Sequence, residues 1–277
     1  MDLESRIKIG IIGITGRMGK IVESVFSASS RYQVIGGYSR RGPLSLESLF
    51  ACSDVVIDFS SPEIMLNVLK TTLQSKKPTP LILCTTGWEK SVVVGNLFAE
   101  VARKTTVVEC SNTSIGANLQ MFVVQKLAEI LPADFDIDIL EKHHRHKLDV
   151  PSGTAKSLAN SVLRGKVSET TKLKAQDFDW CVSTSPLLSG PRKTGQIEIN
   201  SQRSGQLPGD HEVSFTSSLE QLSVRHVAYD RRLFAQGAMV ICDWIVNQVG
   251  KDPSFVGQYN MFDVLGLKNL GSFYAAK

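Results

Sequence analysis

Three of the five histidines of this chain lie within one short basic segment, His143-His144-Arg145-His146-Lys147. So many like charges are costly in a protein interior unless an anion compensates them. Histidine also titrates near neutral pH, so the segment could supply a proton during a reaction. Just downstream, Ser152-Gly153-Thr154 precede a helical run at 155–163, and the amides at a helix start attract anions. The pattern predicts a site that binds and protonates a small dicarboxylate.

Two other interpretations of the basic segment stay open. It could be a solvated surface loop, as short basic runs usually are. It could also bind a metal ion, but no cysteine lies nearby and the interleaved cations oppose one, so we predict no metal. On one continuous strand, His143 and Lys147 would share a face and His144 would point away. A pocket shared by these side chains therefore requires a turn.

A glycine-rich loop lies near the start of the chain, in the segment Gly13-Ile14-Thr15-Gly16-Arg17-Met18-Gly19. It follows an apolar run at 7–12 and precedes a helical stretch at 17–28. Glycines at the first strand-to-helix turn let the backbone approach a pyrophosphate at the helix start. The spacing is GxxGxxG and not the commoner GxGxxG, so an empty glycine turn is the competing interpretation. Its position between strand and helix favours a dinucleotide site.

The residues after the second apolar run bear on which dinucleotide is used. Sites that prefer NAD usually carry Asp or Glu there, to hold the ribose hydroxyls. This chain has Tyr38-Ser39-Arg40-Arg41, whose hydroxyl and guanidinium groups suit a 2′-phosphate. The competing interpretation is that both arginines are solvated surface charges. We predict NADPH as the preferred cofactor and NADH as the second.

The elements that must position these residues follow a regular order in the first part of the chain. Apolar strand-like runs alternate with helical stretches, which indicates a parallel sheet covered on both faces. The strands are predicted at 7–12, 34–38, 54–59, 81–84 and 106–110, and the later helices at 63–75 and 89–103. The fold class is therefore α/β, with a Rossmann-like doubly wound parallel sheet.

After residue 113 the pattern changes to alternating polar and apolar residues. Such strands indicate a second α+β domain with a mixed or antiparallel sheet. We predict a dinucleotide-binding domain at 1–113, a substrate-binding and oligomerisation domain at 114–230, and a C-terminal helix and tail at 231–277 that return to the first domain. The second domain would contain a helix at 118–131 and strands at 135–139, 196–200, 212–215 and 222–228. The site would lie between the domains, with hinges near 112–114 and 230.

The composition excludes several classes of protein. Apolar residues make up 42% of the 277 and charged residues 21%, which is an ordinary globular balance. A net charge of +4 is too small to indicate nucleic acid but suits anionic ligands. The acidic N-terminus is not that of a secretory signal, and the apolar stretch at 238–246 is too short to span a membrane. Five scattered cysteines indicate reduced thiols and a cytoplasmic location.

The segment from Glu141 to Ala155 closely resembles the signature of the dihydrodipicolinate reductase (4-hydroxy-tetrahydrodipicolinate reductase) family. Other motifs of that family occur in the same order, and the resemblance runs from residue 7 to about 267. These motifs are similar to the family's cofactor loop, its third-strand motif, the turn after its fourth strand, its hinge and its C-terminal tail, at 13–19, 58–63, 85–87, 111–116 and 261–267 respectively.

The resemblance implies an activity and residue roles. The reaction would be the NAD(P)H-dependent reduction of 4-hydroxy-tetrahydrodipicolinate to tetrahydrodipicolinate, in diaminopimelate and lysine biosynthesis, by a homotetramer assembled through the second domain's sheet. His143 would be the proton donor and Lys147 its cationic partner. The substrate's carboxylates would be bound by His144, Gly153 and Thr154. The cofactor would be bound by Gly13, Ile14, Thr15, Gly16, Arg17, Met18, Ser39, Arg40, Cys84, Thr85, Thr86, Cys110, Ser111, Asn112 and Thr113.

The chain departs from the family pattern in three places. Ser39 replaces an acidic residue that many members carry, and Cys84 and Cys110 stand where small residues are usual; a buried cysteine more often packs than reacts. The stretch at 168–193 has no interpretation. A short-chain dehydrogenase is excluded, because none of the five tyrosines has a lysine four residues later. The remaining alternative is a non-catalytic NADP-binding sensor whose second domain binds partners.

Overall fold

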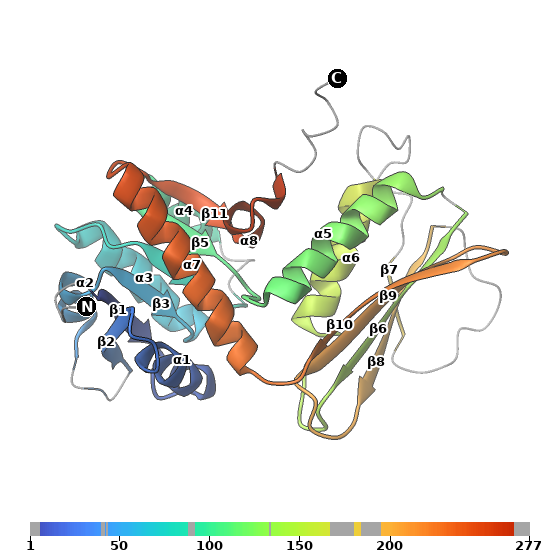
Figure 1. Cartoon of the computed structure of the whole chain (residues 1–277), viewed down its shortest axis with the longest axis horizontal. Helices are drawn as coiled ribbons and strands as arrows, with labels where there is room; N and C mark the ends of the chain where they lie inside the picture. The colour runs from blue at the N-terminus through green and yellow to red at the C-terminus, as the bar shows by residue number, and fades with distance from the viewer. Residues whose placement is uncertain are drawn as a thin grey trace. The chain divides into compact units, whose positions relative to one another are not determined.

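The computed structural model describes residues 6–39, 42, 44–87, 92–132, 134–166, 180–183 and 195–268. The chain forms two compact units, one of Met1–Ile115 with Arg231–Lys277 and one of Gly116–Asp230. It therefore passes between the units twice, once near residue 115 and once near residue 230 (Figure 1). Within the described ranges, no helix is long and apolar enough to cross a membrane.

A parallel sheet forms the centre of the first unit, with strand order β11-β5-β4-β3-β1-β2. Neighbouring residues of a strand enter opposite hydrophobic clusters: Ile11 and Ile57 lie in one, Ile12 and Val56 in the other. Because both faces are buried, the inner strands are nearly continuous apolar runs, whereas the edge strand at 257–260 is polar and more exposed. The strands are β1 (Ile7–Ile12), β2 (Tyr32–Tyr38), β3 (Val55–Asp58), β4 (Leu81–Leu83), β5 (Thr106–Glu109) and β11 (Gly257–Asn260).

Helices cover both faces of this sheet (Figure 1). Buried residues of α1 and α7, such as Phe26 and Ile241, complete one hydrophobic cluster, and those of α2, α3 and α4, such as Leu49 and Leu69, complete the other. The helices are α1 (Arg17–Ser27), α2 (Leu46–Cys52), α3 (Pro62–Gln74), α4 (Val92–Ala102), α7 (Arg232–Lys251) and α8 (Met261–Val264). The short α2 and the edge strand β11 were not predicted.

The second unit contains a mixed sheet with strand order β10-β9-β6-β8-β7. Strand β6 is parallel to β8 and antiparallel to β9, β8 is parallel to β7, and β10 is antiparallel to β9. The strands are β6 (Asp136–His143), β7 (Trp180–Ser183), β8 (Ile197–Arg203), β9 (Gly209–Thr216) and β10 (Gln221–Ala228). The predicted fold class, a doubly wound parallel sheet plus a second mixed sheet, is confirmed. Strand β7 lies in the stretch that had no interpretation.

Two helices, α5 (Ile115–Ile130) and α6 (Gly153–Lys166), lie together on one face of the mixed sheet (Figure 1). Strand β6 alternates accordingly, with Ile137, Ile139, Glu141 and His143 buried and the residues between them more exposed. On α5, the side-chain amide of Gln120 donates to the carbonyl oxygens of His211 and Val224, at 2.8 and 2.9 Å. These two hydrogen bonds fix the helix above β9 and β10.

The end of α5 depends on a buried lysine of α6. Lys166 is 1% exposed, and its ammonium group donates to the carbonyl oxygens of Leu131 and Pro132 at 2.9 and 3.1 Å. Leu131 and Pro132 are the first two residues after α5, and a cation at the end of a helix complements the helix dipole. Burial lowers the pKa of Lys166. The two hydrogen bonds therefore stabilise the packing of α6 against the end of α5.

We predict that Lys166→Ala lowers the free energy of unfolding by about 1–3 kcal/mol, because it removes a buried side chain and its two hydrogen bonds to the chain after α5. Urea unfolding followed by circular dichroism measures the difference. Lys156→Ala, which removes an exposed lysine from the same helix, serves as the control and changes stability by less than about 0.5 kcal/mol. Equal stabilities of the two variants would contradict the capping role.

Candidate active site

The glycine loop lies at the carboxyl edge of the parallel sheet, between β1 and α1. Gly13 has a φ of +81°, in the left-handed region that favours glycine. Its amide donates to the carbonyl oxygen of Tyr38, at the end of β2, at 2.9 Å. A Cβ atom on Gly13 would lie 2.7 Å from the carbonyl oxygen of Phe59, just after β3. The loop is thus held where the strand order reverses, which is where open α/β sheets bind ligands.

This loop leaves the start of α1 open. Gly16 is the N-cap residue and provides no side-chain hydrogen bond, and Thr15, Gly16 and Arg17 are exposed. A Cβ atom on Gly19 would collide with the Gly13 carbonyl, so the loop folds closely over the first turn of the helix. The first amides of a helix have no partner within the helix and bind phosphate readily. The residues present therefore fit the pyrophosphate of a dinucleotide.

A buried carboxyl group, that of Asp58 at the end of β3, lies beside this loop. It is 0% exposed, and it accepts hydrogen bonds from the Ser60 amide and the Thr85 hydroxyl, both at 2.9 Å. Burial raises the pKa of Asp58 to about 6, although the bonds from Ser60 and Thr85 act in the opposite direction. The carboxyl group joins the end of β3 to the turn after β4. The sequence contained this residue in a motif, but we gave it no role.

Two predicted cofactor residues after β4 and β5, Cys84 and Cys110, have their thiols in the interior. Burial raises the pKa of both thiols, that of Cys110 to about 12. The Cys110 thiol donates to the Asn112 carbonyl oxygen at 2.9 Å. These thiols therefore stay protonated at neutral pH, which fits packing better than chemistry.

The remaining predicted cofactor residues differ in how open they are. The hydroxyl of Thr113 donates to the Phe234 carbonyl oxygen at 2.7 Å, and a Cβ atom on Gly237 would collide with the Thr113 carbonyl. These contacts hold the outgoing chain against α7. Thr86 and Ser111 are exposed, and Ile14, Met18, Ser39 and Asn112 are half-buried. Arg40 lies outside the described residues, as does Arg41.

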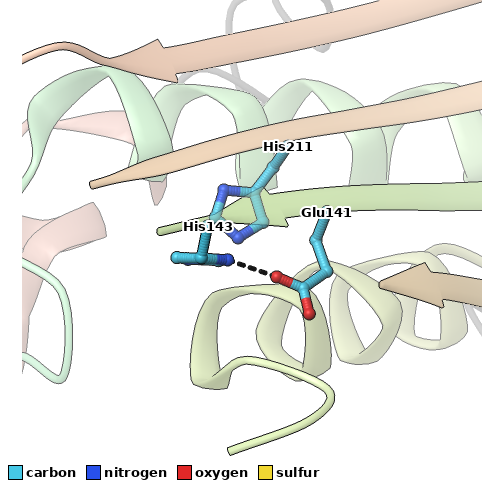
Figure 2. A group of neighbouring side chains, drawn as sticks. All are labelled: Glu141, His143 and His211. Carbon is cyan, nitrogen blue, oxygen red and sulfur yellow. Dashed lines mark ion pairs between the residues drawn. The ribbon is translucent and has the colours of Figure 1, made fainter. Parts of the chain in front are cut away.

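In the second unit, strand β6 ends at His143 and delivers that side chain into a buried polar cluster (Figure 2). His143 is 6% exposed, and its Nδ1 atom faces a carboxylate oxygen of Glu141 in a close ion pair. The ring of His211, from β9, lies edge-on to that of His143 with 5.0 Å between ring centroids. The structure thus brings His143 together with two residues for which the sequence suggested no role.

The rest of the basic segment turns away from the strand. The backbone amide of His144 donates to the Leu207 carbonyl oxygen at 2.8 Å, and that of Lys147 donates back to the His144 carbonyl oxygen at 3.1 Å. The turn that a shared pocket requires is therefore present. The side chain of Lys147 forms an ion pair with Asp149 at 2.8 Å. Arg145 and His146 are exposed.

Ser152 links the cluster to the start of α6. Its hydroxyl caps the helix by accepting from the Ala155 amide at 3.1 Å, and it is hydrogen-bonded to Nε2 of His211 at 3.1 Å. Gly153 is exposed, and a Cβ atom built on it would have no atom within 4 Å. Thr154 is half-buried in the same first turn. The helix start is therefore capped at Ala155 and open at Gly153.

The electrostatics of the cluster are set by a completely buried Glu141. Burial by itself raises the pKa of this carboxyl group, but hydrogen bonds from His143, Arg203 and Ser201 lower it to about 2. The Nη2 atom of Arg203 lies 2.8 Å from Glu141 Oε1. Burial lowers the pKa of His211 to about 3, and the neighbouring His143 acts in the same direction. At neutral pH, Glu141 is thus ionised and His211 is uncharged.

The donor set also resembles a metal site, because one ligand atom from each of Glu141, His143 and His211 lies within 4.8 Å of the others. However, a guanidinium group already pairs with the same carboxylate, and Ser152 occupies Nε2 of His211. A metal ion would have to displace the ion pair between Glu141 and His143. The geometry therefore fits a hydrogen-bonded network of charged groups better than a metal site.

The sequence did not suggest Glu141, Arg203 or His211 as functional residues, and it placed Ser152 only in the predicted anion-binding helix start. They lie on β6, β8, β9 and the start of α6, and only the pairing of strands brings them together. In the register of the sheet, Glu141 is opposite both Ser201 and His211, and His143 is opposite Arg203. One local signal exists: His211 has the same phase as the buried Val213 and Phe215, so the alternation indicates a buried histidine.

A parallel sheet with a glycine loop at its first turn, joined to a mixed-sheet unit with a buried histidine cluster, defines a two-unit dinucleotide-binding oxidoreductase. Residues 7–113 match the family described as "Dihydrodipicolinate reductase, N-terminus", and residues 116–265 match "Dihydrodipicolinate reductase, C-terminus". The chain belongs to the dihydrodipicolinate reductase family.

Individual relatives agree with this assignment. The chain is 38% identical over 272 residues to the 4-hydroxy-tetrahydrodipicolinate reductase of Zymomonas mobilis, covering 96% of this chain and 100% of that protein. It is 37% identical over 242 residues to the protein of the same name from Chlamydia abortus, covering 87% and 93%. In fold it is similar to a dipicolinate-bound dihydrodipicolinate reductase from Paenisporosarcina sp. TG-14, with a TM-score of 0.70, 23% identity, and coverage of 93% and 98%. Nothing among these relatives supports a non-catalytic sensor.

We predict that Asp58 makes the stability of the protein depend on pH. Its pKa is raised from 3.8 to about 6 in the folded chain, so the ionised form is a net cost above pH 6. As the pH falls from about 6 to about 4, the folded protein is protonated at Asp58 while the unfolded chain is still ionised there, so the free energy of unfolding increases. Over the whole range this increase is on the order of 3 kcal/mol.

The test compares wild type with Asp58→Asn, which is neutral at every pH and retains groups for both hydrogen bonds. Urea unfolding between pH 4 and 8 should show wild type gaining stability relative to the variant on acidification. Glu100→Gln, a change at an exposed carboxylate of the same unit, is the control and should parallel wild type. A constant difference between wild type and Asp58→Asn across this range would refute the prediction.

Proposed function

We propose that this chain is an NAD(P)H-dependent reductase that converts 4-hydroxy-tetrahydrodipicolinate to tetrahydrodipicolinate, in diaminopimelate and lysine biosynthesis. The observation that carries the proposal is the position of His143, buried at the end of β6 beside the start of α6 within one unit. A proton-donating histidine and an anion-attracting helix start are what a dicarboxylate substrate requires. Membership of the family supports the same activity.

The substrate's carboxylates are bound by His144, Gly153 and Thr154. Gly153 and Thr154 form the first turn of α6, where the positive end of the helix favours an anion. The open space around Gly153 admits a carboxylate to the backbone, which a side chain at this position would hinder. His144 and Lys147 supply further positive charge from the turn after β6.

The cofactor is held by the glycine loop, from Gly13 to Met18, and by the turns after β4 and β5. When bound, the nicotinamide supplies a hydride. The amides at the start of α1 hold the pyrophosphate. Ser39 and Arg40 bind the 2′-phosphate, so NADPH is preferred and NADH is the second cofactor. Ser39 is half-buried after the end of β2, next to the sheet edge that carries the loop.

His143 donates the proton that balances the hydride, and Lys147 is its cationic partner. One hydride and one proton enter the substrate, and the 4-hydroxy group leaves as water, so atoms and charge balance. The ion pair with Glu141 holds Nδ1 of His143 inside the unit. Nε2 of the same ring lies beside Gly209, where a Cβ atom would be 3.2 Å away, so glycine keeps backbone and imidazole close without a side chain between them.

We also propose that the enzyme is a cytoplasmic homotetramer assembled through the sheet of the second unit. One face of this sheet carries α5 and α6, and its other face presents half-buried residues such as Asp138, Leu140 and Lys142. The cysteines described as free thiols, including three that are buried, suit a reducing compartment. Light scattering of the purified protein at one or two chain masses would exclude the tetramer.

The activity is tested in a coupled assay. A synthase that condenses pyruvate with aspartate semialdehyde generates the substrate in place, and absorbance follows NADPH or NADH. We expect oxidation that depends on the synthase, with a higher kcat/KM for NADPH than for NADH. Folded protein that oxidises neither cofactor would refute the proposed function. Equal efficiencies with the two cofactors would refute only the role given to Ser39 and Arg40.

His143→Gln tests the proton donor. We predict a fall in kcat by about 10²–10⁴-fold, because general acid catalysis is lost, with little change in the Kd for NADPH. The matched control is His146→Gln, which alters an exposed histidine of the same segment and should retain turnover. Near-normal turnover by His143→Gln would remove His143 from the reaction.

A further inference from the structure

The buried carboxylate behind His143 has so far been given only the role of holding Nδ1 of that ring inside the unit. We propose that Glu141 is a positioning residue that fixes the protonation and orientation of the His143 ring, so that Nε2 is the atom that gives up the proton. This inference rests on the proposed function, because it names the device by which the proton donor of that reaction is prepared. Arg203, His211 and Ser152 complete the device from three further elements.

The pleat of β6 places Glu141 and His143 on the same face of the sheet. Residues two apart on a strand point to the same face, and here that face is covered by α6. Glu141 is 0% exposed, and its Oε2 atom meets Nδ1 of His143 (Figure 2). A carboxylate can only accept hydrogen bonds, so Nδ1 must carry a proton. Of the two ring nitrogens, only Nε2 can then take up and release a proton without breaking the pair.

Glu141 can hold the proton on Nδ1 of His143 because its carboxylate stays ionised. Arg203 on β8 donates to its other oxygen, Oε1, at 2.8 Å, and the Ser152 amide approaches the same oxygen at 3.4 Å. These partners offset the cost of burying the charge, and the pKa of Glu141 lies at about 2. Arg203 also donates to the Asp149 carbonyl oxygen at 2.7 Å. The same guanidinium thus connects the carboxylate to the loop that carries Lys147.

His211 keeps the ring of His143 in place from the side of β9. Its ring lies edge-on at 5.0 Å between centroids, and Ser152 at the start of α6 is bound to its Nε2. Burial and the proximity of His143 lower the pKa of His211 to about 3. It therefore adds no positive charge that would oppose an imidazolium at His143. The groups that face His143 are a carboxylate from β6, a guanidinium from β8, and a neutral imidazole from β9.

The arrangement is a carboxylate–histidine pair, in which the carboxylate selects the tautomer and stabilises the charged ring. With Glu141 in place, the proton on Nδ1 of His143 is held in the ion pair, and the proton that can be transferred is on Nε2. Without it, the ring could turn or adopt the other tautomer, and the same atom would no longer be ready. The residue acts through His143 and does not itself need to touch the substrate.

The first test replaces Glu141 with Gln, which retains shape and removes the charge. In the coupled assay, kcat should fall by about 10–100-fold, the range known for carboxylates that orient metal-ligating histidines, with KM little changed. The descending limb of the profile of kcat against pH should move to lower pH, because an imidazolium loses its neighbouring anion. Glu141→Asp should restore part of kcat. Glu220→Gln, at an exposed carboxylate of the same unit, is the control.

A purely structural role would lower stability without moving the pH profile, and that outcome would overturn the proposal. So would activity that EDTA abolishes and zinc restores, since the cluster would then hold a metal ion. Thermal melting and the Kd for NADPH show whether each variant is folded.

The second test uses the wild-type protein and needs neither a stable variant nor turnover. With ¹⁵N-labelled histidine, long-range proton–nitrogen correlations distinguish a ring protonated on Nδ1 from one protonated on Nε2. The signal that is missing from the spectrum of His143→Gln is that of His143. We expect His143 to carry its proton on Nδ1 when neutral. A neutral His143 protonated on Nε2 would refute the role of Glu141 even if the enzyme is active. An inactive wild type with the Nδ1–H ring would refute the proposed function and leave the tautomer assignment intact.

Discussion

The second unit is organised around one buried negative charge, the carboxylate of Glu141. A buried charge is tolerated only if it is paired and hydrogen-bonded. Here β6 supplies His143, β8 supplies Arg203, and the start of α6 supplies the Ser152 amide, while β9 adds His211 beside them. No single element could satisfy the carboxylate. The mixed sheet and its covering helix are therefore required together, and the position of His143 follows from their assembly.

In the first unit, the main constraint is on the conformation of the backbone and not on a buried charge. Its loop must bring amides to a pyrophosphate, so glycine stands at the positions where side chains would strike the Phe59 or Gly13 carbonyl groups. Asp58 is the exception, a carboxyl group with two hydrogen bonds but no cation beside it among the contacts described. The contrast shows in the two pKa values, about 6 for Asp58 and about 2 for Glu141. Both carboxyl groups are buried, so the difference between their pKa values comes from the cationic partner that Glu141 has.

Much of the fold was predictable because both faces of the parallel strands are buried, which leaves continuous apolar runs in the sequence. The elements that were missed are short or lie at an edge. Helix α2 has only seven residues, and β11 has four and pairs with β5 across about 150 residues of chain. A pattern of a few residues at the edge of a sheet carries little periodicity, and long-range pairing leaves no local trace. Strand β7 was missed for the same reason.

The candidate site was predictable only where its residues are neighbours in the sequence. His143 stood out because three histidines and two cations crowd one segment. Its partners Arg203 and His211 lie more than fifty residues away, and each is an isolated residue in an ordinary strand. Register brings them to His143: a shift of one residue in β9 would turn His211 to the opposite face and replace it with Asp210 or Glu212. A second carboxylate would then face Glu141. Val213 and Phe215 pack into the core and fix that register. The apolar packing of the sheet therefore determines which side chain of β9 lies beside His143.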